Sequence, residues 1–68
     1  MASLDYLYSE LSRIEREIQS AQDLLDVETD DDRRYRYQVT LDGLYQAKAD
    51  VEESIQREED AENNQRNY

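Results

Sequence analysis

Carboxylates are the groups in this 68-residue chain best able to do chemistry, because it has no cysteine and no histidine. Their absence excludes the usual zinc sites, thiolate nucleophiles and imidazole bases, and leaves oxygen ligands for a hard cation. Acidic residues alternate, as at the start of an EF-hand loop, at Asp26, Glu28, Asp30 and Asp32. That pattern then fails, since Asp31 stands where the loop needs glycine and Tyr37 where it needs a bidentate glutamate. We therefore expect no metal site, and we interpret these carboxylates as helix caps and solvated charges.

General acid and base catalysis by a carboxylate pair is the other chemistry that this composition allows. It needs a pocket that desolvates one carboxyl group and shifts its pKa. A chain of this length forms one small domain, and the helical pattern described below offers no such cleft. We therefore expect a protein that is not an enzyme and has no cofactor.

The one basic cluster, Arg33, Arg34 and Arg36, is interleaved with tyrosines, a pattern typical of nucleic-acid binding in a basic protein. Here the aspartates at 30–32 cancel it, so pairing within a helical turn is the simpler interpretation. The formal net charge of −10 also disfavours direct binding to nucleic acid or to an anionic membrane. A basic partner is favoured instead. A hairpin dimer that binds RNA is a third class, for which no motif is present.

Apolar residues at alternating intervals of three and four predict an all-helical fold, an antiparallel two-helix hairpin of the coiled-coil type. The first run is Leu4, Leu7, Leu11, Ile14, Ile18, Ala21 and Leu25, and the second is Tyr37, Leu41, Leu44, Lys48, Val51 and Ile55. We expect one domain over 1–62, with a helix over about 4–27, a turn over about 28–32 and a helix over about 33–61. Residues 63–68 are expected to form a frayed polar tail.

Capping residues and the register of the two runs place the turn independently. Ser3 is expected to cap the first helix and Thr29 the second, with Asp32 in the reciprocal position of a capping box. In the antiparallel register that suits both runs, paired residue numbers sum to 62, so the centre of symmetry falls at Asp31. Lys48 then lies in the seam, where we expect it to extend to the surface and pair with a carboxylate.

A lone two-helix seam buries little area, so the sequence favours a homodimer of hairpins that forms a four-helix bundle. Tyr37 and Tyr45 are expected to fill this bundle. Residues that widen the apolar stripe for the dimer or for a partner are Tyr8, Leu24, Val39 and Tyr45, with Ala47 beside them. A monomeric hairpin docked on another protein, or a longer assembly, would use the same stripe.

Both arms are acidic, with a net charge of −5 over 1–28 and −6 over 38–62, which costs repulsive energy when the arms pack together. We hypothesise that this acidity binds and inhibits or regulates a basic protein, such as a nucleic-acid-binding one, as phage-type inhibitors and DNA mimics do. Candidate contacts are Glu10, Glu17, Asp42, Asp50, Glu52, Glu53, Glu58, Glu59 and Asp60. The alternative is a structural or assembly adaptor, or a small chaperone, that docks through the apolar stripe. A solubilising role for the charge is the third interpretation.

No apolar run is long enough for a membrane span or for the core of a signal peptide. We therefore expect a soluble, unexported, cytoplasmic protein, in the host cytoplasm if it is viral. The lack of cysteine is compatible with a reducing compartment.

Overall fold

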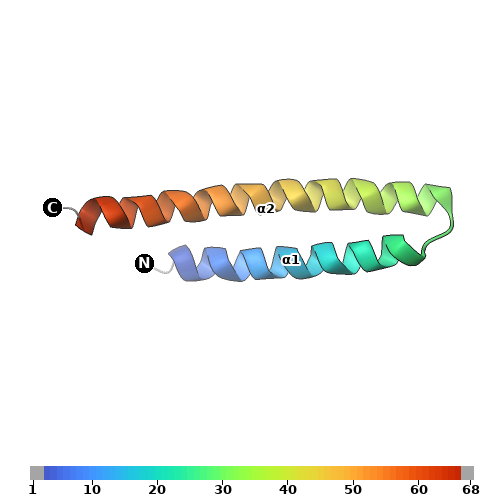
Figure 1. Cartoon of the computed structure of the whole chain (residues 1–68), viewed down its shortest axis with the longest axis horizontal. Coiled ribbons are helices and arrows are strands. Elements are labelled where there is room, and N and C mark those ends of the chain that lie inside the picture. The colour runs from blue at the N-terminus through green and yellow to red at the C-terminus, as the bar shows by residue number, and fades with distance from the viewer. Residues whose placement is uncertain (1–2, 67–68) are drawn as a thin grey trace.

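Two antiparallel helices form the fold in the computed structural model, which describes residues 3–66 (Figure 1). Helix α1 spans Ser3–Val27 and helix α2 spans Asp31–Arg66, and the loop between them is residues 28–30. The molecule is a rod of 58 × 15 × 14 Å, with the loop at one end and both chain ends at the other, which we call the open end. The predicted all-helical hairpin is thus confirmed.

The second helix is longer than the sequence pattern indicates. It begins at Asp31 instead of residue 33, and it continues to Arg66, past the expected end near Ala61. The tail expected to fray from residue 63 is therefore helical as far as Arg66, and residues 67–68 lie outside the described residues. Side chains four residues apart support the exposed surface of α2 as far as Asp60, at Gln46–Asp50, Glu53–Arg57 and Gln56–Asp60.

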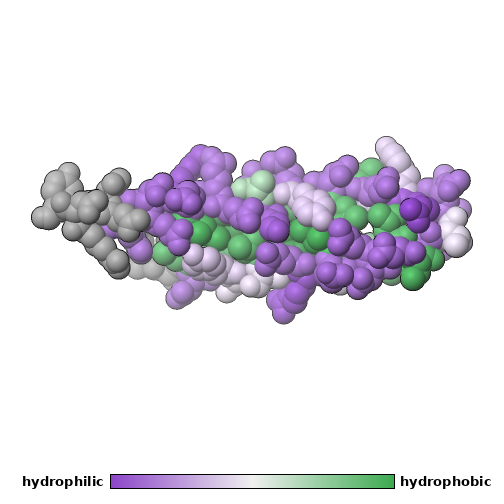
Figure 2. Space-filling model, in the orientation of Figure 1, coloured by the Kyte–Doolittle hydropathy of each residue, from purple (hydrophilic) through white to green (hydrophobic). Residues whose placement is uncertain are grey.

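The core is a single seam between the two helices. Its buried residues are Ile14, Ile18, Ala21, Leu41 and Ile55. The first four form one cluster, against which the partly buried residues Leu25, Leu44, Ala47 and Val51 pack. All except Ala47 are positions of the predicted runs. Figure 2 shows the result as a hydrophobic strip between two hydrophilic helices.

Hydrogen bonds across the seam define the antiparallel alignment. The Tyr8 hydroxyl donates to Glu59 Oε2 at 2.8 Å, and Gln22 Nε2 donates to the Tyr45 hydroxyl at 3.0 Å. Moving 14 residues along α1 from the first pair to the second moves 14 residues back along α2. The helices therefore keep one register over most of the length of α1.

Lys48 occupies the seam as predicted and extends to its edge. Its Nζ lies 3.6 Å from Glu15 Oε2, and its side chain is 31% exposed. The aliphatic stem thus covers apolar surface while the ammonium group remains in water with a carboxylate partner. The expected pairing with a carboxylate is confirmed.

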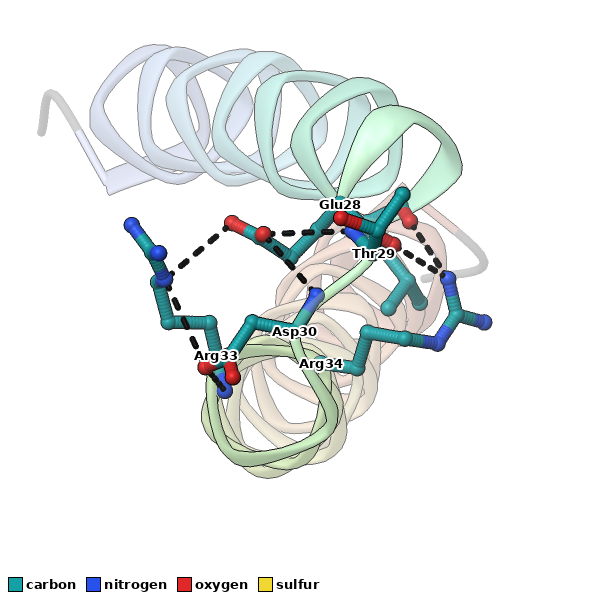
Figure 3. A network of polar contacts seen from close by, with 6 residues as sticks. Glu28, Thr29, Asp30, Arg33 and Arg34 are labelled. Carbon is teal, nitrogen blue, oxygen red and sulfur yellow. Dashed lines mark hydrogen bonds and ion pairs between the residues drawn. The ribbon is translucent and has the colours of Figure 1, made fainter.

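The cap of α2 is Asp30, and the expectation of Thr29 is wrong. Asp30 Oδ2 accepts a hydrogen bond from the backbone N–H of Arg33 at 3.2 Å, the geometry of a helix N-cap (Figure 3). Glu28 Oε2 accepts from the backbone N–H groups of Thr29 and Asp30, both at 3.2 Å. Glu28 therefore has the reciprocal role expected of Asp32, because the loop folds its carboxylate back over the start of α2.

Two arginines of the basic cluster lie on opposite sides of this loop (Figure 3). Arg34 Nη1 donates to the carbonyl oxygens of Leu25 and Glu28, both at 3.0 Å, and so satisfies carbonyl groups at the end of α1. Arg33 Nε lies 3.6 Å from Glu28 Oε1 and 3.5 Å from Asp30 Oδ2. The predicted internal pairing is confirmed for Arg33, and Arg34 is used to join the helices.

Candidate interaction surfaces

The seam divides the surface of the rod into two long faces with different chemistry. One face, which we call the tyrosine face, contains the cross-helix contacts Tyr8–Glu59, Gln22–Tyr45 and Glu15–Lys48. The α1 residues of these contacts recur every seven positions, at 8, 15 and 22, and on α2 Tyr45 and Glu59 lie fourteen positions apart with Glu52 midway between them. Lys48 reaches this face from the seam. Each residue advances about 100° around a helix, so the residue that follows a seam residue lies beside the seam on this same face.

The tyrosine face is strongly acidic. Its six carboxylates, three from each helix, belong to Asp5, Glu15, Asp26, Asp42, Glu52 and Glu59. Among the side chains of residues 4–62, Lys48 brings a positive charge from the seam to this face. Tyr8 and Tyr45 lie among these carboxylates, with 46% and 45% of their surface exposed. This combination of exposed rings and carboxylates suits a partner that has both cationic and apolar groups.

The hydrogen bond to Glu59 changes the ionisation of Tyr8. The pKa of Tyr8 is raised above its ordinary value, mainly because its hydroxyl donates to this carboxylate and secondarily through desolvation and the negative charge nearby. Ionisation of the phenol, which would break this contact between the helices, is therefore shifted to a higher pH than for an ordinary tyrosine.

The opposite face, which we call the groove face, contains an apolar groove of about 450 Å³ between the helices. The uncharged residues that line it are Ser20, Ala21, Leu24, Tyr37, Thr40 and Leu44, with Arg13, Arg16 and Glu17 at the rim. Leu24 is 49% exposed here, and Tyr37 is half-buried. Further along α2, the same face continues through Ala47 and Ser54, both half-buried.

Charges on the groove face are mixed. Its acidic residues are Glu10, Glu17 and Asp50, and its basic residues are Arg13, Arg16, Arg36 and Arg57. Arg13 binds Glu10 Oε2 at 2.8 Å and Glu17 Oε1 at 2.7 Å. The pKa of Glu10 is lowered, chiefly by that hydrogen bond from Arg13 and also by one from the Tyr6 hydroxyl. The pKa of Arg13 is raised, first by Glu10 and then by Glu17. With three acids against four bases, this face is close to neutral.

The structure does not gather the predicted acidic contacts onto one surface. Asp42, Glu52 and Glu59 lie on the tyrosine face, whereas Glu10, Glu17 and Asp50 lie on the groove face. Glu53 and Asp60 lie on the outer side of α2, and Glu58 follows the seam residue Val51 by seven positions. The four residues predicted to widen one apolar stripe are likewise separated: Tyr8 and Tyr45 are on the tyrosine face, Leu24 is on the groove face and Val39 is on the outer side of α2.

Sequence reasoning missed the acidic residues that α1 contributes to the tyrosine face, Asp5, Glu15 and Asp26. A signal was present, because Glu15 follows Tyr8 by seven residues, just as Glu52 follows Tyr45. Charge also varies along the rod. Around the open end, residues 3–10 and 52–62 contain eight acidic residues and one basic residue, a net charge of −7. In the middle, residues 11–22 and 37–51 have a net charge of only −1.

Within residues 3–66, no three acidic side chains converge in a way that could hold a metal ion. In the same part of the chain, neither helix has a stretch that is both long and apolar enough to cross a membrane. Comparison with known protein families, characterised proteins and solved structures finds no match for this chain.

Proposed function

We propose that this chain is a non-catalytic protein-interaction module whose tyrosine face binds a basic surface of another protein and so inhibits or regulates it. The single observation that supports this most strongly is the segregation of charge. Six carboxylates occupy one face and the opposite face is nearly neutral, so the acidity is not the uniform surface that solubility alone requires. Such a face attracts a cationic partner from a distance and orients it.

A nucleic-acid-binding protein is the partner class that this surface fits best. Its site is basic and shaped for a row of anionic groups, and the tyrosine face presents carboxylates along most of the rod. Tyr8 and Tyr45 add rigid rings that can stack on arginine or pack against apolar groups. Tyr8 is held in place by Glu59, and Tyr45 by Gln22, which reduces the entropy lost when a partner binds.

Neutralising variants of equal net charge test this proposal. One variant removes three charges from the tyrosine face: Glu15→Gln, Asp42→Asn and Glu52→Gln. The matched control removes three from outer positions: Asp23→Asn, Glu53→Gln and Asp60→Asn. Tagged wild-type and variant chains are used to capture proteins from a lysate of the native host, and the bound proteins are challenged with salt and with short duplex DNA.

The expected result is a protein that wild type and control retain, that the tyrosine-face variant loses, and that DNA displaces. Equal loss from both variants would mean that net charge alone acts. Retention by both variants, resistant to DNA and salt, would overturn the acidic-face mechanism.

Self-association into a four-helix bundle remains part of the proposal. Among the side chains of residues 4–62 only five are buried, all along one seam, so each helix leaves much of its apolar surface in water. Pairing two hairpins would bury more of it.

A structural or assembly adaptor is the second candidate function, and the groove around Leu24 favours it. Binding of that kind would persist in high salt and would be lost on Leu24→Glu.

A further inference from the structure

The groove face and the tyrosine face differ in their ability to contact a second copy of the same face. Two tyrosine faces brought together would place six carboxylates against six others, with strong repulsion in a partly dehydrated interface. Two groove faces would bring three acidic and four basic residues against the same mixture. A surface with both signs in similar numbers can complement itself, as a two-fold interface requires.

Gly43 lies on the groove side of α2, and no contact within residues 3–66 explains a glycine there. It is the one glycine of the sequence, it is in the interior of a 36-residue helix, and its φ is not positive. A Cβ built at this position meets nothing within 4 Å. Glycine here costs helix stability without relieving any contact inside the hairpin. Close approach of another helix would give a reason for it.

From these observations we infer that the groove face is the self-association surface, on which a second copy of this chain lies antiparallel, so that α2 packs against α2 near Gly43. This inference rests on the self-association proposed above and adds the face and the direction. Each groove then receives the partner's groove-face side chains around Leu24 and Leu44.

Charge selects the antiparallel direction. A parallel arrangement would put the two open ends, each of net charge −7, side by side. In the antiparallel arrangement these ends lie at opposite ends of the bundle, and the nearly neutral middle segments overlap. With the two-fold axis near Gly43, Asp50 of each copy comes within side-chain reach of Arg36 of the other, an oppositely charged pair.

The area available is sufficient for a weak specific dimer. Overlap of α2 from its first residue to about residue 56 spans roughly 36 Å. Over a rod 15 Å wide this buries on the order of 1,000 Å² in total, at the low end for specific interfaces. We therefore expect a dissociation constant of roughly micromolar order. The open ends and both tyrosine faces stay uncovered, so the dimer would present two acidic surfaces.

Two matched substitutions test the face. Gly43→Gln adds a side chain to the groove face, and Ala49→Gln adds the same side chain to an exposed position on the tyrosine-face side of α2. Sedimentation equilibrium on the full chain measures the dimer dissociation constant, and circular dichroism confirms that each variant is folded. We expect Gly43→Gln to raise the dissociation constant by about tenfold or more, equivalent to ~1.4 kcal/mol, and Ala49→Gln to leave it nearly unchanged.

Spin labels test the direction, since the chain has no cysteine and single-cysteine variants label uniquely. For Asp60→Cys, two labels in the antiparallel dimer are about 50–55 Å apart, whereas a parallel dimer brings them within about 20 Å. Gln46→Cys, near the axis on the outer side of α2, gives a short distance in either case and serves as control.

The outcomes separate the inference from the proposals on which it rests. A monomer at hundreds of micromolar overturns both self-association and the face, and leaves the acidic-face function to its own capture experiment. A dimer that is weakened by Ala49→Gln and not by Gly43→Gln keeps self-association and overturns the assigned face. A short distance at residue 60 overturns the antiparallel direction.

Discussion

Replacing the cap of α2 distinguishes two neighbouring residues that the sequence alone ranks in the wrong order. Asp30→Ala removes the carboxylate that accepts from the backbone N–H of Arg33 at 3.2 Å, together with its contact to the Arg33 guanidinium. Loss of an N-cap costs about 1 kcal/mol, and the exposed ion pair adds little. In a domain of this size ~1 kcal/mol corresponds to about 4–8 °C in Tm.

Thermal unfolding followed by far-ultraviolet circular dichroism measures this shift, at protein concentrations held equal because self-association would also raise Tm. Thr29→Ala is the matched control. Among the contacts of residues 3–66, Thr29 donates its backbone N–H to Glu28, which alanine retains, and its hydroxyl has no part in the cap. We expect a change within about 0.3 kcal/mol for Thr29→Ala and a similarly small one for Asp30→Asn, which keeps an acceptor. A Thr29→Ala cost equal to or larger than that of Asp30→Ala would refute the assignment.

Three further substitutions examine the seam and the tyrosine face. Ile18→Ala in the buried core should cost about 2–4 kcal/mol, enough to unfold a hairpin with one layer of core, and helicity against urea measures it. Lys48→Met should stabilise the hairpin by up to about 1 kcal/mol, because methionine fills the seam without a charge and the lost ion pair with Glu15 is exposed and therefore weak. A fall in the urea midpoint would contradict this. Tyrosinate absorbance should show one group titrating above the ordinary tyrosine range, and Tyr8→Phe should remove it. Because that pKa is raised, the stabilisation from the Tyr8–Glu59 contact is complete below the ordinary tyrosine pKa and is lost as pH rises through the folded value.

The hairpin itself follows from features that are repeated along the chain. Seam spacing of three and four recurs in both runs, so no single residue decides the fold. Lys48 was predictable for the same reason, because a long side chain at a seam position has one way to keep its charge in water.

Local choices were harder to predict because two or three residues compete for each. Thr29 and Asp30 are both good N-caps, and the backbone path through the loop decides which oxygen meets the N–H of Arg33. The end of α2 depends on exposed pairs such as Gln56–Asp60, each worth a few tenths of a kcal/mol, which apolar periodicity does not register. The position of such a helix end is decided by several weak side-chain interactions added together.

The distribution of charge around the seam could have been read from the sequence, because face follows from heptad position once the seam is fixed. A net charge summed along each helical arm does not show this distribution, because each arm contributes residues to both the tyrosine face and the groove face. The distinction has a mechanistic consequence, because a net charge of −10 opposes self-association only if it lies where two copies meet. Here six carboxylates lie on the tyrosine face and the mixed charges lie beside the groove, so one side can meet its own copy while the other attracts a cationic surface. Moving a single acidic residue from the first side to the second, as in Glu52→Gln with Ser54→Glu, would keep the net charge. It should weaken the attraction of a cationic partner to the tyrosine face, while the groove face would then have four acidic and four basic residues and could still meet its own copy.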